Sequence, residues 1–450
     1  MAQPMSNGTR PLNAGQIRWS ITMLLTTYFA YGGYYLTRKV FTICKTSIAE
    51  DFGWQLSDTK WIWGSFLIAY AIGQILNSFI GRKWGPRLLL VGGLGISIVI
   101  NVIFGFANSF STFVVFMFFN GLVQASGWPG AVGGIAHWLR PSQRGLIMGF
   151  WSTSYLVGNI VVKSLGGTLL EAYGWRYSFW GLTLLGFGVW WIVFLFQRNK
   201  PQDVGLEPIV DKSSEDLRSI RVAEEDQVTF YEYLRLARNP VILIMGVSYF
   251  CIKFLRYAID SWLPAFLDIQ GFSKADASHY SMIFDVAGFA GAVLAGYALD
   301  KIFRGNWAAL CFIMGLGMIV GYVAVIVYGT SPLWMAICFG LVGFMLYGPD
   351  TLLCGAASVT VAGEQNGVAV AGLVNGIASV GPILQELVIG ELIEGDKTEE
   401  IVKGISKANT LALSMSVLFT VFMLFMMWWL RRTHRRHMEA DARLSKDSGT

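Results

Sequence analysis

The sequence predicts an all-α membrane protein with twelve transmembrane helices in two related six-helix bundles. The first observation is composition: the chain of 450 residues is 54% hydrophobic and only 14% charged, whereas soluble domains carry roughly 25% charged residues. The second is that apolar stretches of about 20 residues, enough to cross a bilayer, recur along the chain. In lipid each backbone N–H and C=O group must form its hydrogen bond within the segment that spans the membrane, so we expect helices rather than isolated strands. The third is an internal repeat.

The predicted helices form two sets of six, with one long polar segment between them. The first set runs 20–37, 61–80, 88–107, 112–136, 146–169 and 177–197. The second set runs 240–263, 281–299, 307–328, 332–354, 367–393 and 408–430. The first helix is too long for a removed signal peptide and lacks a small-residue cleavage site. We therefore expect an N-terminal bundle over 20–197, a linker over 198–239 and a C-terminal bundle over 240–430.

Basic residues in the short loops predict the orientation. Loops after even-numbered helices carry Arg82, Lys83, Arg87, Arg140, Arg144, Lys301 and Arg304. The opposite loops 107–112 and 328–332 carry no Lys or Arg. We expect residues 1–19, the linker and the basic tail 431–450 to be cytoplasmic. The net charge of +5 follows from this bias, so it does not indicate a nucleic-acid partner.

The internal repeat relates the two bundles. "NGLVQASGWPG" (120–130) matches "FGLVGFMLYGPD" (339–350), "QRG" (143–145) matches "QNG" (365–367), and "GRK" (81–83) aligns with "DKI" (300–302), all at offsets of 219 to 222. Counting the Gly-Leu-Val and the proline of the first pair separately, four ordered matches at these similar offsets indicate homologous bundles in parallel repeat. In such folds the substrate site lies between the halves near the membrane midplane.

A similar offset, 218, carries Arg38 onto Arg256. Arg38 alone could be an interfacial anchor whose side chain extends to the headgroups. Arg256 lies well inside its predicted helix, where a charge costs at least about 2.5–3.5 kcal/mol unless it faces protein or water. The planar guanidinium fork matches phosphate oxygens and stays protonated. We therefore expect both arginines to face a central cleft and bind an oxyanion.

Several motifs together resemble the organophosphate:phosphate antiporters of the major facilitator superfamily. They are "YYLTRK" (34–39), "RYAIDSW" (256–262), "GWPG" (127–130), "QRGLIMGFW" (143–151), "YGP" (347–349) and "LDKIFRGNW" (299–307). The resemblance covers most of 20–430. It implies the major facilitator fold and exchange of glycerol-3-phosphate, hexose-6-phosphates or phosphoglycerate for inorganic phosphate, without a cofactor. It also implies that Arg38 and Arg256 bind the phosphate group.

The chain departs from the family pattern at three places. Gln74 stands where many bacterial members have a lysine, and Tyr155 where many have a histidine. The cytoplasmic loop motif of the family contains an acidic residue. In the first half of this chain that position is Gly81, while the second half keeps an acid, Asp300. We expect Asp300, Lys301 and Arg82 to form the gating motif.

Other charges inside the predicted spans complete the candidate site. Lys163 and Asp285 are expected either to pair across the halves and switch partners during transport or to form a static buried ion pair. Lys253 lies one turn before Arg256, and Asp260, four residues after Arg256, can fold back onto it. Asp350 is interpreted as a proton acceptor or as the partner of a ligand hydroxyl.

Three aromatic residues, Tyr35, Tyr155 and Trp128, offer hydroxyl, indole and ring faces of the kind that hold sugars. Their alternative role is ordinary packing. The "GGLG" stretch at 92–95 lies inside a predicted membrane helix and is interpreted as a helix-packing feature rather than a phosphate-binding loop.

The expected function is exchange of a phosphorylated metabolite for inorganic phosphate by rocker-switch alternating access. Alternatives are a proton-coupled organic-anion symporter, with Asp285 or Asp350 as the proton site, and a transporter-like receptor for sugar phosphates. The cysteines have no paired or metal-binding spacing, and no nucleophile and base lie at reachable spacing, so an enzyme is not expected. The expected setting is a monomer in a lipid bilayer, with short loops favouring a bacterial plasma membrane.

Overall fold

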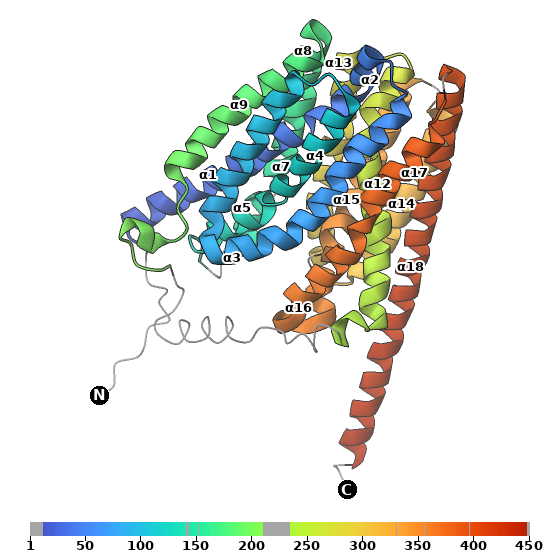
Figure 1. Cartoon of the computed structure of the whole chain (residues 1–450). Coiled ribbons are helices and arrows are strands. Elements are labelled where there is room, and N and C mark those ends of the chain that lie inside the picture. Colours follow the sequence, from blue (N-terminus) through green and yellow to red (C-terminus); the bar gives the residue numbers. More distant parts are fainter. Residues whose placement is uncertain are drawn as a thin grey trace. The chain divides into compact units, whose positions relative to one another are not determined.

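The computed structural model describes residues 12–140, 144–151, 153–209, 235–329, 331–354, 356–395 and 397–447. Within these ranges it describes all side chains except those of 75, 78, 79, 81, 82, 144–146, 149, 332, 354, 356, 359, 362–369 and 433–447. The described residues are helical, with no strand among them (Figure 1). Backbone proximity divides the chain into unit 1, residues 1–227 with 272–282, and unit 2, residues 228–271 with 283–450.

Unit 1 is a bundle of helices, of which α3 and α4 lie side by side. Its helices are α1 (Ala14–Arg38), α2 (Val40–Phe52), α3 (Thr59–Gly105), α4 (Phe110–Gln124), α5 (Gly127–Ala136), α6 (Arg144–Trp151), α7 (Ser154–Val161), a π-helical turn (Val162–Gly166), α8 (Gly167–Tyr173) and α9 (Trp175–Phe196).

The first helix is longer than the predicted span 20–37. The Asn13 side chain accepts a hydrogen bond from the Gln16 backbone N–H at 2.7 Å and so caps the start of α1. At Lys39, with φ −90° and ψ −11°, α1 passes directly into α2, which ends at Gly53 with φ 66°. Arg38 therefore lies within a helical run from residue 14 to 52. The predicted span 20–37 covers only part of this run, because α2 continues it through the buried Lys45.

A break divides α3 where two separate spans were predicted. Gly85 adopts φ 80° and ψ 168°, a conformation that L side chains rarely take, and Pro86 follows it. The Asn199 side chain accepts a hydrogen bond from the Arg87 backbone N–H at 2.8 Å, which satisfies a donor released by the break. The helical runs on the two sides match the predicted helices 61–80 and 88–107.

Unit 2 contains α12, the last part of α13 and five further helices, with α14 and α18 side by side (Figure 1). The helices are α12 (Pro240–Ile269), α13 (Lys274–Lys301), α14 (Trp307–Tyr328), α15 (Pro332–Cys354), α16 (Ala356–Ala378), α17 (Val380–Leu392) and α18 (Thr398–Asp447). Residues 274–282 of α13 belong to unit 1 and the rest of this helix to unit 2.

Nine helical segments of the described residues are long and apolar enough to cross a membrane. They are 83–105, 110–136, 175–196, 240–269, 274–301, 307–328, 333–353, 370–392 and 398–432. The other three predicted spans fall in helical runs at 14–52, at 59–84, and at 144–151 together with 154–173.

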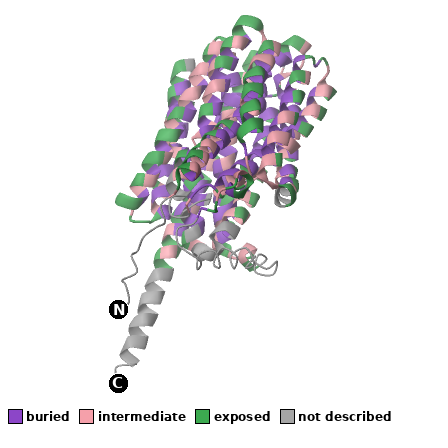
Figure 2. Cartoon of the chain, turned by 90° about the vertical axis from the view of Figure 1, so that its left-hand side faces the viewer, coloured by how far each residue is buried: buried purple, intermediate pink, exposed green. Residues whose placement is uncertain are grey.

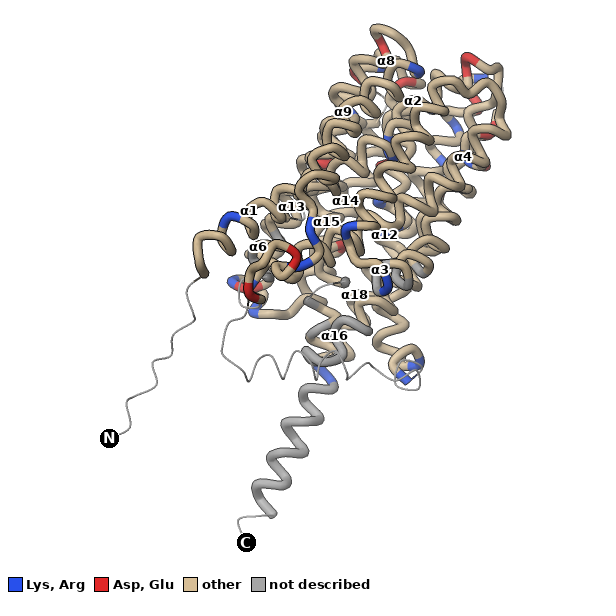
Figure 3. The backbone as a smooth tube through the Cα atoms, turned by 60° about the vertical axis from the view of Figure 1, so that its left-hand side comes forward, with Lys and Arg blue, Asp and Glu red and all other residues tan. Residues whose placement is uncertain are grey.

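The surface of each unit suits lipid. Large apolar side chains are exposed on the outer faces of the helices, among them Leu184, Val320 and Trp428. Figure 2 shows the buried residues on the inward sides of the helices, and Figure 3 shows charged residues near several helix ends as well as others along the helices. Exposed apolar bands bounded by charged ends are typical of helices that cross a bilayer.

Candidate anion-binding site

Arg38 is a buried cation in the interior of unit 1, with only 5% of its surface exposed. Its Nε donates a hydrogen bond to Oε1 of Gln124 at 3.1 Å, and its Nη2 donates to the Gln124 backbone carbonyl at 3.4 Å. The guanidinium carbon lies 5.0 Å from the ring centre of Tyr35 and 4.7 Å from that of Tyr70. These contacts exclude the interfacial-anchor interpretation, because the side chain lies inside the protein.

A buried polar network holds the amide of Gln124 in place. Its Nε2 donates to Thr37 Oγ1 at 2.8 Å and to Ser97 Oγ at 2.7 Å. Ser97 Oγ donates to Asn120 Oδ1 at 2.6 Å, and the Asn120 and Asn101 amides both donate to the Thr37 carbonyl. The network joins α1, α3 and α4. Because both amide hydrogens of Gln124 are used, its oxygen is directed at Arg38.

The aromatic residues predicted near the site form one cluster in unit 1. The rings of Tyr35 and Tyr155 have centres 6.0 Å apart. Tyr31 lies 5.7 Å from Tyr35 and 5.4 Å from Trp128. Trp128 keeps 42% of its surface exposed. Tyr35 thus packs against both Arg38 and the cluster, so the packing role left open by the sequence is real, and the sugar-binding role stays a prediction.

Arg256 forms an ion pair inside unit 2. Its Nη1 lies 2.6 Å from Oδ2 of Asp350, and its guanidinium carbon lies 4.9 Å from the ring centre of Tyr347. The Tyr347 hydroxyl donates in turn to Oδ1 of Asp285 at 3.2 Å. The sequence singled out Asp350 without naming Arg256 as its partner. The proposed contact of Asp260 with Arg256 stays a prediction.

Lys253 lies one helical turn before Arg256 on α12. Its Nζ donates to Oδ1 of Asn375 at 2.6 Å and to Oγ of Ser379 at 3.3 Å, and it lies 5.2 Å from the ring centre of Tyr249. The lysine is therefore held by uncharged oxygens of α16 and the residue that follows it.

Lys163 lies in the π-helical turn of unit 1 and is 1% exposed. Its Nζ donates to the Ser281 carbonyl at 3.2 Å, and its own carbonyl accepts from Ser278 Oγ at 2.8 Å. A π-turn leaves backbone carbonyls free for such bonds and is frequent at functional sites. Lys163 thus binds the first turns of α13. Its predicted pairing with Asp285, a residue of unit 2, stays a prediction.

The predicted gating motif is only partly described. Asp300 and Lys301 are exposed at the end of α13. The side chain of Arg82 lies outside the described residues. The gating role of the three residues stays a prediction.

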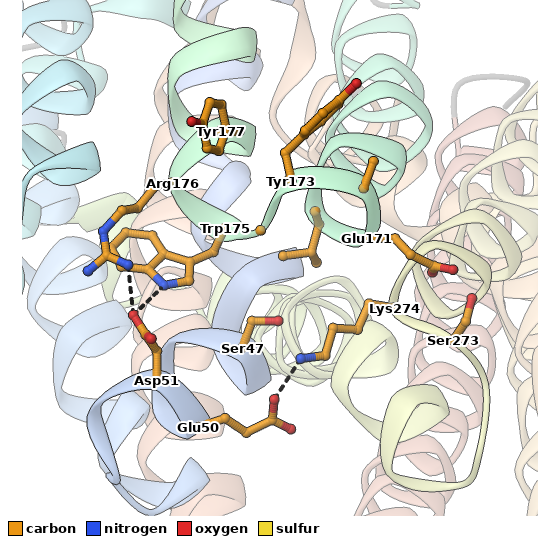
Figure 4. A pocket seen from close by; sticks show the side chains of 13 residues that line it. Ser47, Glu50, Asp51, Glu171, Tyr173, Trp175, Arg176, Tyr177, Ser273 and Lys274 are labelled. Carbon is orange, nitrogen blue, oxygen red and sulfur yellow. Dashed lines mark hydrogen bonds and ion pairs between the residues drawn. The ribbon is translucent and has the colours of Figure 1, made fainter.

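A cavity of about 820 Å³, lined by both charged and aromatic side chains, lies at the end of unit 1 where α2 and α8 end and α9 begins (Figure 4). Arg176 Nη1 and Trp175 Nε1 both donate to Oδ2 of Asp51, at 2.8 Å and 3.0 Å. Lys274 Nζ lies 2.6 Å from Oε2 of Glu50. The hydrogen bond from Arg176, and after it that from Trp175, lowers the pKa of the Asp51 carboxyl.

Glu171 lies in the same cavity and caps α13. Its Oε2 accepts a hydrogen bond from the Ala275 backbone N–H at 2.8 Å, and this bond lowers the pKa of Glu171. A carboxylate at a helix start also interacts favourably with the helix dipole. This cavity was not expected from the sequence.

Sequence reasoning also missed Gln124 and Tyr70 as neighbours of Arg38. A signal for Gln124 was present: Asn120 and Gln124 stand four residues apart in an otherwise apolar helix, and that spacing puts both on one face. Tyr70 carries no such signal. Among the described residues, no group of three or more His, Cys, Asp or Glu side chains is placed to hold a metal ion.

The helical fold, the lipid-facing surfaces and the buried cations define a polytopic membrane protein that binds or moves a solute. The family model "Major Facilitator Superfamily" matches residues 27–385. The chain belongs to this superfamily, which is a family of transporters, not of enzymes. It is a multi-pass integral membrane protein.

Similar proteins support the resemblance drawn from the motifs. The glycerol-3-phosphate transporter of Bacillus subtilis is 25% identical and aligns with 78% of this chain and 81% of its own length. The membrane sensor protein UhpC of Escherichia coli is 26% identical, over 81% of this chain and 84% of its own length. Human sugar phosphate exchanger 3 is 25% identical, over 77% of this chain and 80% of its own length.

A solved structure shares the fold. A bacterial homolog of the human lysosomal transporter Spinster, in an inward-facing and unoccupied conformation, superposes with a TM-score of 0.74 at 18% identity. The match covers 93% of this chain and 98% of the other. The predicted all-helical major facilitator fold is confirmed.

Proposed function

We propose that the chain is a secondary active transporter that exchanges a phosphorylated metabolite, of the sugar-phosphate or glycerol-3-phosphate type, for inorganic phosphate. The observation that carries the proposal is the buried, oriented guanidinium of Arg38. A charged side chain inside a membrane span is costly and marks a candidate functional site. The amide of Gln124 orients this guanidinium without adding a negative charge. The names of the similar proteins supply the class of substrate.

The phosphoryl group binds Arg38 of unit 1 and Arg256 of unit 2. Guanidinium groups donate parallel hydrogen bonds to phosphate oxygens, and a phosphate ester carries about −1.5 to −2 charges at pH 7. Lys163, Lys253, Tyr35, Tyr155 and Trp128 supply further contacts to phosphate or to the organic part.

Exchange follows from a difference in barriers. Ligand binding favours reorientation only if the ligand has a higher affinity for the occluded state than for the open states. A carrier that reorients much faster loaded than empty couples efflux of one anion to uptake of the other. In this rocker-switch cycle Asp285, Asp260 and Asp350 balance charge, and Asp300, Lys301 and Arg82 act in gating.

Two other functions compete. In a proton-coupled organic-anion symporter, Asp285 or Asp350 would carry the proton. A receptor that binds sugar phosphates without moving them is favoured by one observation, the similarity to a membrane sensor protein. The proposed setting is a monomer in a bacterial plasma membrane with both termini cytoplasmic.

Reconstitution of the purified chain tests these proposals. Liposomes preloaded with inorganic phosphate receive labelled phosphorylated metabolites of three to six carbons outside. Exchange predicts uptake that requires internal phosphate. Uptake driven by an imposed pH gradient without internal phosphate would support the symporter, and saturable binding without flux would support the receptor.

A further inference from the structure

Asp350 is a buried carboxylate in which one oxygen forms an ion pair and the other lacks a hydrogen-bond partner among the described residues. It lies on α15 directly after Pro349, and only 5% of its surface is exposed. Oδ2 forms the 2.6 Å ion pair with Arg256. Oδ1 is buried and has no hydrogen-bond partner among the described residues.

Two donors, one turn from Asp350 on α15 and one turn from Arg256 on α12, form hydrogen bonds with other residues. The Tyr347 hydroxyl, one turn earlier on α15, donates to Asp285, and Lys253 donates to Asn375 and Ser379. A buried acceptor without a donor is costly and calls for an explanation, which a bound water or ligand can supply. Oδ1 is therefore positioned to accept a hydrogen bond from a bound molecule.

The ion pair also changes what Arg256 can offer. A guanidinium paired with a carboxylate at 2.6 Å has much of its charge offset and one donor occupied. A phosphoryl group that reaches Arg256 must share it with Asp350. The pair Arg256–Asp350 thus presents both donors and an acceptor, which suits a polyol better than a bare oxyanion.

We propose that Asp350 determines specificity for the organic part of the ligand, by accepting a hydrogen bond at Oδ1 from a hydroxyl of a polyol phosphate. This inference rests on the proposed exchange function and names one of its specificity residues. Sites that hydrogen-bond a substrate hydroxyl discriminate against analogues that lack it, because the buried partner is then left unpaired.

The test compares glycerol-3-phosphate with propyl phosphate, which has the same carbon chain and phosphate but no hydroxyl. Each ligand competes with labelled inorganic phosphate for binding to the purified full-length chain. We expect the wild type to prefer glycerol-3-phosphate by about tenfold or more, the worth of one hydrogen bond to a charged group. In Asp350→Val this preference disappears, because without the carboxylate neither ligand leaves a buried acceptor unpaired.

Two further variants keep the test decisive. Asp350→Asn is nearly isosteric and tests the charge if the valine variant fails to fold. Its preference for glycerol-3-phosphate over propyl phosphate should lie between that of the wild type and that of Asp350→Val. Thr351→Val is the matched control, because Thr351 Oγ1 bonds to carbonyls of its own helix at 2.9 Å and 3.1 Å. Its preference should equal that of the wild type.

Exchange of labelled for unlabelled inorganic phosphate, measured in parallel, separates the two levels of the argument. No phosphate exchange by the wild type would overturn the proposed function itself. Phosphate exchange with an unchanged hydroxyl preference in Asp350→Val, or in Asp350→Asn if only that variant folds, would overturn the role of Asp350 alone. If an Asp350 variant keeps the hydroxyl preference but loses an uptake that the wild type drives with a pH gradient, Asp350 would be a proton site and not a specificity residue.

Discussion

Arg38 donates two hydrogen bonds to one residue, Gln124: Nε to the side-chain oxygen at 3.1 Å and Nη2 to the backbone carbonyl at 3.4 Å. The partner is uncharged, so this pair fixes the plane of the guanidinium without offsetting its charge. Arg256, its equivalent in the repeat, is bonded to a carboxylate instead. The two arginines are thus equivalent in sequence and different in chemistry.

The first prediction concerns Gln124. In Gln124→Leu the guanidinium of Arg38 loses its side-chain acceptor, so the ligand must bind to an unoriented group. We expect KM for phosphate exchange to rise by about tenfold, the worth of a charge-assisted hydrogen bond, with a smaller change in kcat. Gln124→Glu should be worse, because its carboxylate competes with phosphate for Arg38. Initial rates in proteoliposomes measure both values.

Asn101→Ala is the control for Gln124. Asn101 belongs to the same network and donates to the Thr37 carbonyl, but it bonds to neither Gln124 nor Arg38 in the contacts described above. Its loss should lower thermal stability slightly and leave KM unchanged. A wild-type KM in Gln124→Leu would show that Arg38 needs no orientation by the amide.

The second prediction separates charge from shape at both arginines. Arg38→Lys and Arg256→Lys keep the positive charge but lose the planar fork that matches phosphate oxygens. We expect each to abolish exchange while protein levels in the membrane stay normal. Arg198→Lys is the control, because Arg198 Nη1 bonds only to nearby carbonyls at the end of α9 in the contacts given for it. Near-normal exchange in Arg38→Lys or Arg256→Lys would show that this arginine does not need its planar guanidinium to bind two phosphate oxygens.

Helix positions were largely predictable from the sequence. Hydropathy and the repeat predicted the order of helices and placed Arg256 inside α12. The break between two spans of α3 follows from Gly85 and Pro86, which carry a clear local signal. These features depend on neighbours in the chain, which a sequence displays directly.

The contacts of the site were less predictable. Arg256 and Asp350 are 94 positions apart, and hydropathy gives no rotation of one helix about its axis relative to another. The extension of α1 into α2 was missed because the predicted span 20–37 ends at the charged pair Arg38 and Lys39, although both are buried. The π-turn at Lys163 depends on bonds to Ser278 of a distant helix.

The third prediction is a pH dependence at the polar end of unit 1. The helical run 14–52 is roughly 58 Å long at 1.5 Å per residue, against about 30 Å of bilayer hydrocarbon, so its last turn extends beyond the lipid. Hydrogen bonds from Arg176 and Trp175 lower the pKa of Asp51 in that turn. The stability this gives is present above the ordinary carboxyl pKa of about 3.9 and is lost as pH falls through the lowered value.

Asp51→Asn tests this dependence. The side chains of Arg176 and Asp51 are 38% and 44% exposed, so the loss at neutral pH should be at most about 1 kcal/mol. The difference in Tm between wild type and variant should shrink as pH falls below about 4. Glu50→Gln removes the neighbouring ion pair with Lys274. When Asp51→Asn is made in this background, the acid-dependent difference in Tm between Asp51 and its asparagine variant should persist. A difference that stays constant down to the lowest pH would contradict the assignment.

The last prediction uses two adjacent glycines of α3 as a matched pair. The Tyr34 hydroxyl is hydrogen-bonded to Ser126 Oγ at 2.8 Å and to the Leu89 carbonyl at 2.9 Å. A Cβ at Gly93 would overlap both the Tyr34 hydroxyl and Ser126 Oγ, whereas a Cβ at Gly92 would meet nothing within 4 Å. Gly93 therefore lets α3 approach α1, which carries Tyr34, and Ser126 at the start of α5.

Gly93→Ala should lower stability by about 1–3 kcal/mol, the usual cost of overpacking a close contact. Gly92→Ala should be neutral or slightly stabilising, because alanine favours a helix over glycine by about 1 kcal/mol. The fraction of each variant that stays monodisperse after heating in detergent measures the difference. Because both changes add one methyl group to the same helix one residue apart, equal stability of the two variants would show that α3 does not pack against Tyr34 and Ser126 in this way.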